Sequence, residues 1–235
     1  MRTDVVVLLV GLFTVVGLPA IADQPSTVLG VNQAPVARSV PDGPDTALNQ
    51  PPNASNGIFS DIGCDMCTTG IQIVGDNVVV STGGMGYEPD EITIWGGFYP
   101  NNTPVPVTFD IFFYPDSGGV PGATPTCYAT GISPTSDILT GVTLFGVSEH
   151  EILLTISGCT LSDGTYWLVW YTDTGLGTDD FFWETGTLDG TSGVAGSVWT
   201  TANPPTTWTP DAATDMSVLL TGTILPVEIQ SFSIK

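Results

Sequence analysis

Carboxylates are the side chains with which this sequence could most readily do chemistry. The chain has 24 Asp and Glu, 3 Lys and Arg, and one histidine, His150. Glu149 and Glu151 flank that histidine and would project from one side of a strand, about 6 to 7 Å apart, a spacing open to carboxylate-based hydrolysis of glycosides. Two solvated acids are the simpler interpretation in so acidic a chain. The sequence around His150 has no nucleophile elbow and no Gly-rich phosphate loop, so we predict no catalytic residue.

Calcium binding is the more reasonable functional use of the acids. Hard cations take Asp carboxylates and backbone carbonyls from Gly-rich loops. Two segments have this composition, one beginning at Asp116 and the other running from Asp173 to Asp179 and Asp180. Neither matches the Asp-x-Asp-x-Asp-Gly pattern of an EF-hand. These four aspartates are the candidate calcium ligands, and calcium is the only cofactor that the sequence suggests.

Aromatic residues near expected strand ends and in Pro/Gly-rich loops offer a second kind of binding chemistry. An exposed ring could stack on a sugar while a nearby Asp or Asn accepts hydrogen bonds from the sugar hydroxyls. Packing in the core is the alternative at each position. Trp208, between prolines, is the best candidate for exposure. The candidates are Trp95, Phe98, Tyr99, Trp183, Trp199 and Trp208.

The four cysteines indicate disulfides, because their number is even and the chain reads as exported. Four cysteines allow three pairings, and the sequence does not choose among them. We expect Cys64 to pair with Cys67 and Cys127 with Cys159, the second bond joining two neighbouring strands. A redox role for the first pair would need a βαβ setting, of which there is no sign.

The amino terminus is typical of a signal peptide. A short charged start precedes an apolar run from Val5 to Leu18, and Ala20-Ile21-Ala22 supplies the small residues of a cleavage site. We predict cleavage after Ala22, with an uncleaved membrane anchor as the alternative. Residues 23–56 are rich in Pro, Ser and Asn and are expected to form a flexible arm. Residues 57–224 are expected to form one domain, and 225–235 a tail or edge strand.

The expected domain is all-β, an antiparallel β-sandwich resembling a jelly roll. Short β-type runs follow one another, separated by Gly, Pro, Asn and Asp. Val107, Phe109, Ile111 and Phe113 alternate along one run and share a face, whereas residues 166–171 are apolar on both faces and should form a central strand. The expected strands span 71–74, 77–82, 91–98, 106–114, 126–130, 138–145, 149–156, 165–172, 180–185, 197–200 and 215–223.

Four segments carry a resemblance to a known kind of module. They are Glu91-Ile-Thr-Ile-Trp-Gly-Gly-Phe-Tyr99, the run from Phe109 to Gly122 with its Gly-Gly-Val-Pro-Gly turn, and Leu161 to Val169 with Phe182-Trp-Glu184. Together they resemble a β-sandwich module of exported bacterial proteins that carry C-terminal sorting signals. The tail from Leu225, with Leu-Pro-Val-Glu, is similar to the segment that precedes such signals. The resemblance implies a β-sandwich from about 71 to 224 and brings no catalytic residues.

Charge narrows the classes of function. A net charge of -21 with three basic residues excludes direct nucleic-acid binding and disfavours anionic membranes. We expect a secreted or cell-surface, non-catalytic structural or adhesive protein, whose partners are further copies of itself or other extracellular proteins. A carbohydrate-binding module that takes polysaccharide, with or without calcium, is the first alternative, and a carboxylate-based hydrolase is the second. The mature chain is not expected to insert into a membrane.

Overall fold

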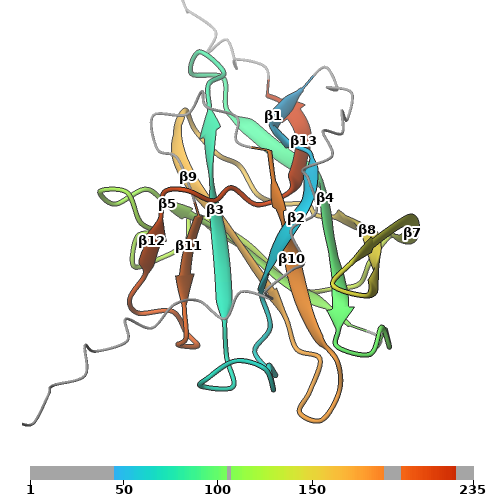
Figure 1. The fold of residues 1–235 in the computed structure, drawn as a ribbon. Helices are drawn as coiled ribbons and strands as arrows, with labels where there is room; N and C mark the ends of the chain where they lie inside the picture. The colour runs from blue at the N-terminus through green and yellow to red at the C-terminus, as the bar shows by residue number, and fades with distance from the viewer. Residues whose placement is uncertain (1–44, 105–106, 188–196, 226–235) are drawn as a thin grey trace, which may run out of the picture.

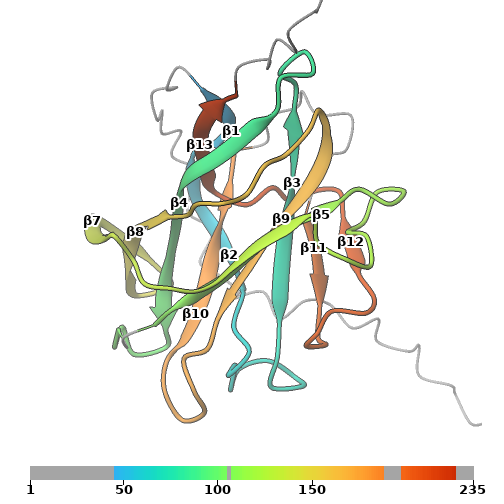
Figure 2. The same ribbon diagram turned by 180° about the vertical axis from the view of Figure 1, so that it is seen from behind.

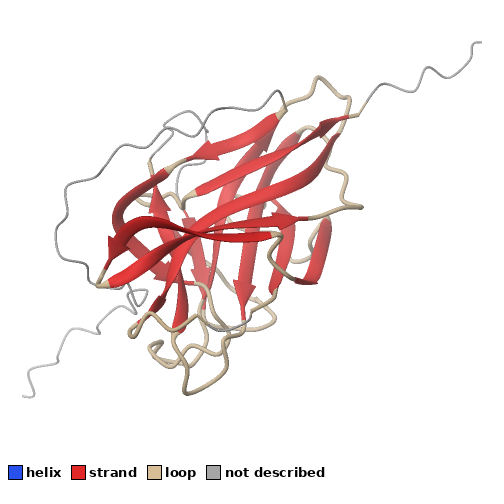
Figure 3. Ribbon diagram, turned by 90° about the vertical axis from the view of Figure 1, so that its right-hand side faces the viewer, coloured by secondary structure: helices blue, strands red, loops and turns tan. Residues whose placement is uncertain are grey.

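The strands of this chain form two antiparallel sheets packed face to face, as a β-sandwich. The structure is a computed structural model in which residues 45–104, 107–187 and 197–225 are described. The described residues form strands and loops, with no helix (Figure 3). The all-β sandwich expected from the sequence is therefore confirmed.

The first sheet is built around the long strand β4. Strand β8 pairs with one side of β4, while β13 and β10 follow each other along its other side. Beyond them lie β1 against β13 and β2 against β10, and β7 forms the opposite edge against β8 (Figure 1). The strands of this sheet are β1 (Thr46–Gln50), β2 (Pro52–Phe59), β4 (Tyr87–Tyr99), β7 (Ser136–Leu144), β8 (Val147–Thr155), β10 (Asp180–Gly186) and β13 (Val218–Ile224).

The second sheet has six strands in the order β12-β11-β3-β9-β5-β6 (Figure 2). Its central strand β9 has apolar side chains on both faces, as its sequence predicts, and both faces are buried. The strands are β3 (Ile73–Val80), β5 (Phe109–Pro115), β6 (Cys127–Ile132), β9 (Gly164–Thr172), β11 (Ser197–Thr200) and β12 (Thr209–Asp211).

Alternating side chains from both sheets fill the space between them. Phe109, Ile111 and Phe113 of β5 point into this core and belong to the same cluster of buried side chains as Ile92 and Ile94 of β4. A second apolar cluster lies on the outer face of the first sheet, where the Phe182 ring crosses two neighbouring strands. A Cβ added at Gly57 would lie 2.4 Å from that ring, so glycine is required for this approach.

Both expected disulfides are present. Cys64 and Cys67 close a loop after β2, with their Cα atoms 5.4 Å apart. Cys127 begins β6 and Cys159 follows β8, with Cα atoms 5.6 Å apart. The second bond therefore joins an edge strand of one sheet to the end of a strand in the other, rather than two neighbouring strands of one sheet. It connects the two layers of the sandwich.

The prediction of a flexible arm that reaches residue 56 is wrong for residues 46–56. They form β1 and most of β2, so the folded domain begins before residue 57. The polar composition of the segment hid the strands, because they lie at a sheet edge and bury only alternate side chains such as Leu48 and Ala54. Two further differences are that β3 is one strand where two runs were expected, and that β12 was not expected.

Several predicted features lie outside the described residues. They are the signal peptide at 1–22, the arm from 23 to 44, and the tail beyond residue 225 with its expected edge strand. Within the described ranges, no helix has the length and apolar character needed to cross a membrane.

Removing the disulfide between Cys127 and Cys159 should destabilise the fold strongly. Its 32-residue separation predicts a loss of about 3 to 4 kcal/mol in the free energy of unfolding for the double Cys→Ser variant. The Cys64–Cys67 bond spans a sequence separation of only three residues. The matched variant that lacks it should therefore lose about 2 kcal/mol in the free energy of unfolding. Urea unfolding of both variants measures the difference, and equal losses would contradict the assignment of the longer bond as the main crosslink.

Candidate functional site

The outer face of the second sheet carries a cluster of aromatic side chains that we call the aromatic row. Because side chains alternate along a strand, the residues of β5 between the core positions point outward. These are Phe112 and Tyr114, joined by Tyr171 of β9 and by Tyr128 of β6. Trp208, just before β12, completes the row.

Phe112 lies at the centre of the row. Its ring stacks on Tyr128 at 6.0 Å and on Tyr171 at 5.7 Å between centroids, with interplanar angles of 27° and 22°. Tyr114 lies 6.0 Å from Phe112 and meets the Trp208 ring edge-on at 6.2 Å. Rings from four separate parts of the chain are thus in mutual contact along one face.

Exposure along the row is uneven. Tyr128 is 65% exposed, whereas Tyr114 and Tyr171 are each 7% exposed. Phe112 and Trp208 are half-buried. Tyr128 stands on the edge strand β6, so the free side of its ring faces solvent while Phe112 supports the other side. The inner rings hold the exposed ring in place.

Two carboxylates border the aromatic row. Asp110, half-buried on the same face of β5, interacts with the Tyr171 hydroxyl and accepts a 2.8 Å hydrogen bond from the Gly131 amide. Asp116 accepts a 2.9 Å hydrogen bond from the Trp167 indole N–H. Burial, and then the charge of Asp110, raise the pKa of Tyr171 to about 12. This hydroxyl therefore stays protonated at neutral pH and remains a hydrogen-bond donor.

Most of the aromatic residues proposed from the sequence lie in the interior. Trp95, Trp183 and Trp199 are 2%, 0% and 7% exposed, so core packing, the alternative considered at each position, holds for these three. Each sits within a strand rather than at a loop tip. Tyr99 is half-buried and packs against Phe59. Of the proposed residues, the structure brings only Trp208 into the aromatic row.

The other members of the aromatic row were missed in the sequence, although a signal for them was present. The alternation that places Phe109, Ile111 and Phe113 in the core also assigns Phe112 and Tyr114 to the opposite face. Tyr128 sits in a short strand without obvious periodicity. Its position beside Phe112 depends on the β5–β6 register, which the sequence does not reveal.

The four predicted calcium ligands serve as separate hydrogen-bond acceptors. Asp116 and Asp173 each accept bonds from nearby glycine amides, Gly118 and Gly119 for the first and Gly175 for the second. In the described part of the chain, no three His, Cys, Asp or Glu side chains form a group that could hold a metal ion. Asp116 lies in the β5–β6 loop, whereas Asp173 and Asp179 lie in the β9–β10 loop and Asp180 begins β10. The positions of these acids therefore do not support a calcium site at either of the two predicted loops.

Asp179 and Asp180 are buried and tie loops together. Asp179 accepts bonds from the Asn101 and Thr103 amides at 3.0 and 2.7 Å. Asp180 accepts hydrogen bonds from the amides of Asp65 and Met66 at 2.9 and 2.8 Å. Main-chain amides therefore occupy these carboxylates where a cation was expected.

Asp61 is a buried acid that the sequence analysis did not identify. It is fully buried and accepts hydrogen bonds from the amides of Gly63, Thr174 and Phe181 and from the Thr174 hydroxyl. Burial raises its pKa, against the opposing effect of these hydrogen bonds. Burial also raises the pKa of Asp180.

The acidic triplet around His150 does not form an open catalytic cleft. Glu149 is fully buried, and the half-buried Glu151 accepts a 3.1 Å hydrogen bond from the Trp95 indole. A cavity of about 220 Å³ lies elsewhere, between Asp45, Thr82, Tyr87 and Ile224. Neither glutamate lines it.

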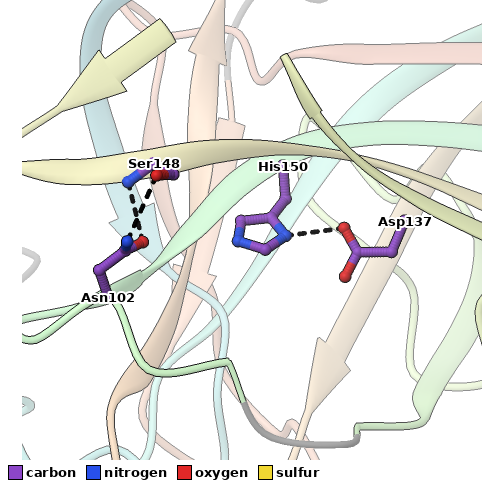
Figure 4. Close-up of polar contacts among 4 residues, drawn as sticks. All are labelled: Asn102, Asp137, Ser148 and His150. Atoms are coloured by element: carbon purple, nitrogen blue, oxygen red, sulfur yellow. Dashed lines mark hydrogen bonds and ion pairs between the residues drawn. The ribbon is translucent and has the colours of Figure 1, made fainter. Parts of the chain in front are cut away.

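His150 pairs with a carboxylate across the β7–β8 hairpin. Its Nδ1 lies 2.7 Å from Oδ1 of Asp137 (Figure 4). Its ring meets the Phe98 ring edge-on. Ser148, two residues away, interacts with Asn102 instead (Figure 4). The His150 Nε2, which a nucleophile would have to approach, is buried and has no hydrogen-bond partner. The arrangement lacks the contact between serine and histidine that a catalytic triad needs.

Comparison with known proteins yields no relative: no protein-family model, curated protein or solved structure matches the chain. The interpretation of the aromatic row therefore rests on its own geometry.

The buried Asp61 should leave a signature in the pH dependence of stability. Because its folded-state pKa is raised above the ordinary value of 3.8, it contributes stability at low pH that is lost as the pH rises through the folded pKa. We expect the stability advantage of the native protein over Asp61→Asn to grow as the pH falls from about 7 toward about 4. Denaturant unfolding over that range measures it.

Asp163 provides a control of opposite sign. Hydrogen bonds from Thr82 lower its pKa, so its contribution is present above 3.8 and is lost as the pH falls through the lower folded pKa. The advantage over Asp163→Asn should therefore shrink in acid. Parallel pH profiles for the two variants would show that the burial of Asp61 does not control its protonation.

Proposed function

We propose that this chain is an exported, non-catalytic adhesive protein that binds polysaccharide on its aromatic row. The observation that carries the proposal is the stack of Tyr128, Phe112 and Tyr171 on three adjacent strands, which ends in a supported ring that is 65% exposed. Contiguous apolar patches with a polar rim are typical of binding surfaces, and the aromatic row with its bordering carboxylates has this form.

The chemistry around this ring suits a sugar. The apolar C–H face of a pyranose can stack on the free side of Tyr128, while hydroxyl groups at its edge can bond to neighbouring polar groups. Asp110 supplies an acceptor next to the rings, and the buried Tyr171 hydroxyl interacts with this carboxylate and holds it in place. The half-buried Trp208 lies at the opposite end of the row and offers a second contact for an extended chain.

Charge restricts the class of polysaccharide. The three basic residues of the chain are Arg2, Arg38 and Lys235, all outside the described residues. The described surface therefore has carboxylates with no Lys or Arg to balance them, and an anionic polymer would be repelled. A neutral glycan, or a cationic one with amino sugars, fits this site.

Export and a structural role complete the proposal. The two disulfides support an oxidising compartment, in agreement with the predicted signal peptide. The buried state of Glu149 favours binding over carboxylate-based hydrolysis, because a catalytic acid must reach the glycosidic oxygen.

Replacing the exposed ring should weaken glycan binding. Tyr128→Ala removes one stacking contact, so we expect its affinity for a neutral or amino-sugar polymer to be about three- to tenfold lower than that of the native protein. Native affinity electrophoresis through gels that contain cellulose derivatives, xylan, chitosan or alginate measures the retardation, with calcium and with chelator.

The matched control is Tyr99→Ala, the same substitution at a half-buried ring outside the aromatic row. It should keep the retardation of the native protein, and alginate should retard no form. Equal retardation of native protein and Tyr128→Ala, or mobility unchanged by every neutral and cationic glycan, would overturn the proposal for the glycans used.

A further inference from the structure

The exposed ring of the aromatic row stands on a strand that the sheet holds only weakly. Strand β6 is the last strand of its sheet, and among the described strands it pairs only with β5. That pairing has a register shift, and β6 has only six residues. Three of its side chains are half-buried and the others are exposed. An edge strand with so few buried contacts opens easily unless another bond fixes it.

The apolar anchors of β6 are small. Side chains alternate along the strand, so Cys127 and Ala129 pack against the core while Tyr128 faces outward. Ala129 has a single methyl group, and Ile132 lies at the end of the strand, beyond the register shift. Burial of these side chains therefore contributes little to holding the segment that carries Tyr128.

The disulfide between Cys127 and Cys159 adds a covalent anchor to this segment. Cys159 is 4% exposed and belongs to the core cluster between the sheets. Because it follows β8, the bond attaches β6 to the opposite layer of the sandwich. Cys127 comes directly before Tyr128, and the two residues pair with Phe113 and Phe112 of β5. The disulfide therefore fixes the backbone next to the point from which the exposed ring projects.

We propose that the Cys127–Cys159 disulfide completes the polysaccharide site, so that binding depends on the oxidation of these two cysteines. The inference rests on the proposed function and adds its regulation. With the bond formed, Tyr128 is held against Phe112 and one face of its ring is free for a sugar. With both cysteines reduced, β6 separates from β5 and the row loses this ring. The chain would therefore acquire its affinity for polysaccharide only outside a reducing compartment.

The second disulfide provides a comparison within the same molecule. Cys64 and Cys67 lie in the loop after β2 and belong to the apolar cluster on the outer face of the first sheet. No residue of the aromatic row belongs to that cluster. Loss of this bond should therefore leave the row and its affinity unchanged.

Reduction by dithiothreitol tests the dependence on oxidation. The reagent supplies two electrons and two protons: the S–S bond breaks, two S–H groups form, and dithiothreitol closes into its own cyclic disulfide. In a variant with Cys64→Ser and Cys67→Ser, Cys127–Cys159 is the one disulfide left, since the chain has four cysteines. Affinity electrophoresis of this variant through xylan or chitosan should show about three- to tenfold weaker binding after reduction, as for Tyr128→Ala, and recovery after reoxidation.

A double-mutant cycle distinguishes this role from a general loss of stability. The bond-free variant, with Cys127→Ser and Cys159→Ser, should bind as weakly as Tyr128→Ala. Combining all three changes should lower the affinity no further, because each acts on the same ring. Leu220→Ala shortens a fully buried side chain of β13, so it should lower the melting temperature and keep the native affinity. A thermal melt establishes that each variant is folded at the temperature of the gel.

Hydrogen–deuterium exchange separates this inference from the proposed function, because it needs no glycan. Amides of residues 127–132 should exchange at least about tenfold faster in the bond-free variant, while those of β9 exchange as in the native protein. Unchanged exchange in β6, or equal acceleration in β6 and β9, overturns the inference whatever the glycan result. Native affinity in the bond-free variant, together with weak binding by Tyr128→Ala, also overturns it and leaves the proposed function standing.

Discussion

Carboxylates that accept main-chain N–H groups hold this sandwich together. With 24 acids and three basic residues, the chain has almost no cations with which to pair them. Asp61, Asp179 and Asp180 bond to amides that lie far away in the sequence. The same bond links Glu184 to the Ala54 amide at 2.7 Å, where the backbone takes a positive φ. Loops that lack regular pairing are thus fixed to the sheets, and the sheets in turn hold the outer rings in register.

This way of satisfying acids has an energetic consequence. Hydrogen bonds from three amides stabilise the charged form of a buried carboxylate. The raised pKa of Asp61 shows that burial destabilises this charged form by more than the hydrogen bonds stabilise it. The cost is tolerable because several neighbouring loops depend on the same residues. Asp65 illustrates this: its amide donates to Asp180, while its own carboxylate accepts from Gly177. Each acid connects two segments, so the loops at this end of the sandwich form one bonded unit.

The sequence predicted the class of fold because alternation and turn residues are local signals. Residues 166–171, apolar on both faces, became the buried central strand β9, and the cysteine pairs are those expected. Strand pairing is not local, and here the predictions failed. Trp183 falls in a strand that was expected, but nothing near it in the sequence shows that its ring packs inside the core against Trp170. Tyr128 was overlooked because its neighbour Phe112 comes from another strand. The candidate site is a product of register, which composition does not encode.

The scarcity of lysine also bears on how the sheet edges avoid unwanted pairing. Natural β-proteins often place lysine on an edge strand, where its charge and its hydration keep other strands away. This chain has one lysine, outside the described residues, and instead uses proline and short strands at its edges. Carboxylates could serve the same purpose, yet β7 has only Asp137, and that side chain is engaged with His150. Strand β7, with nine residues and no proline, is therefore the described edge strand with the least local protection against pairing.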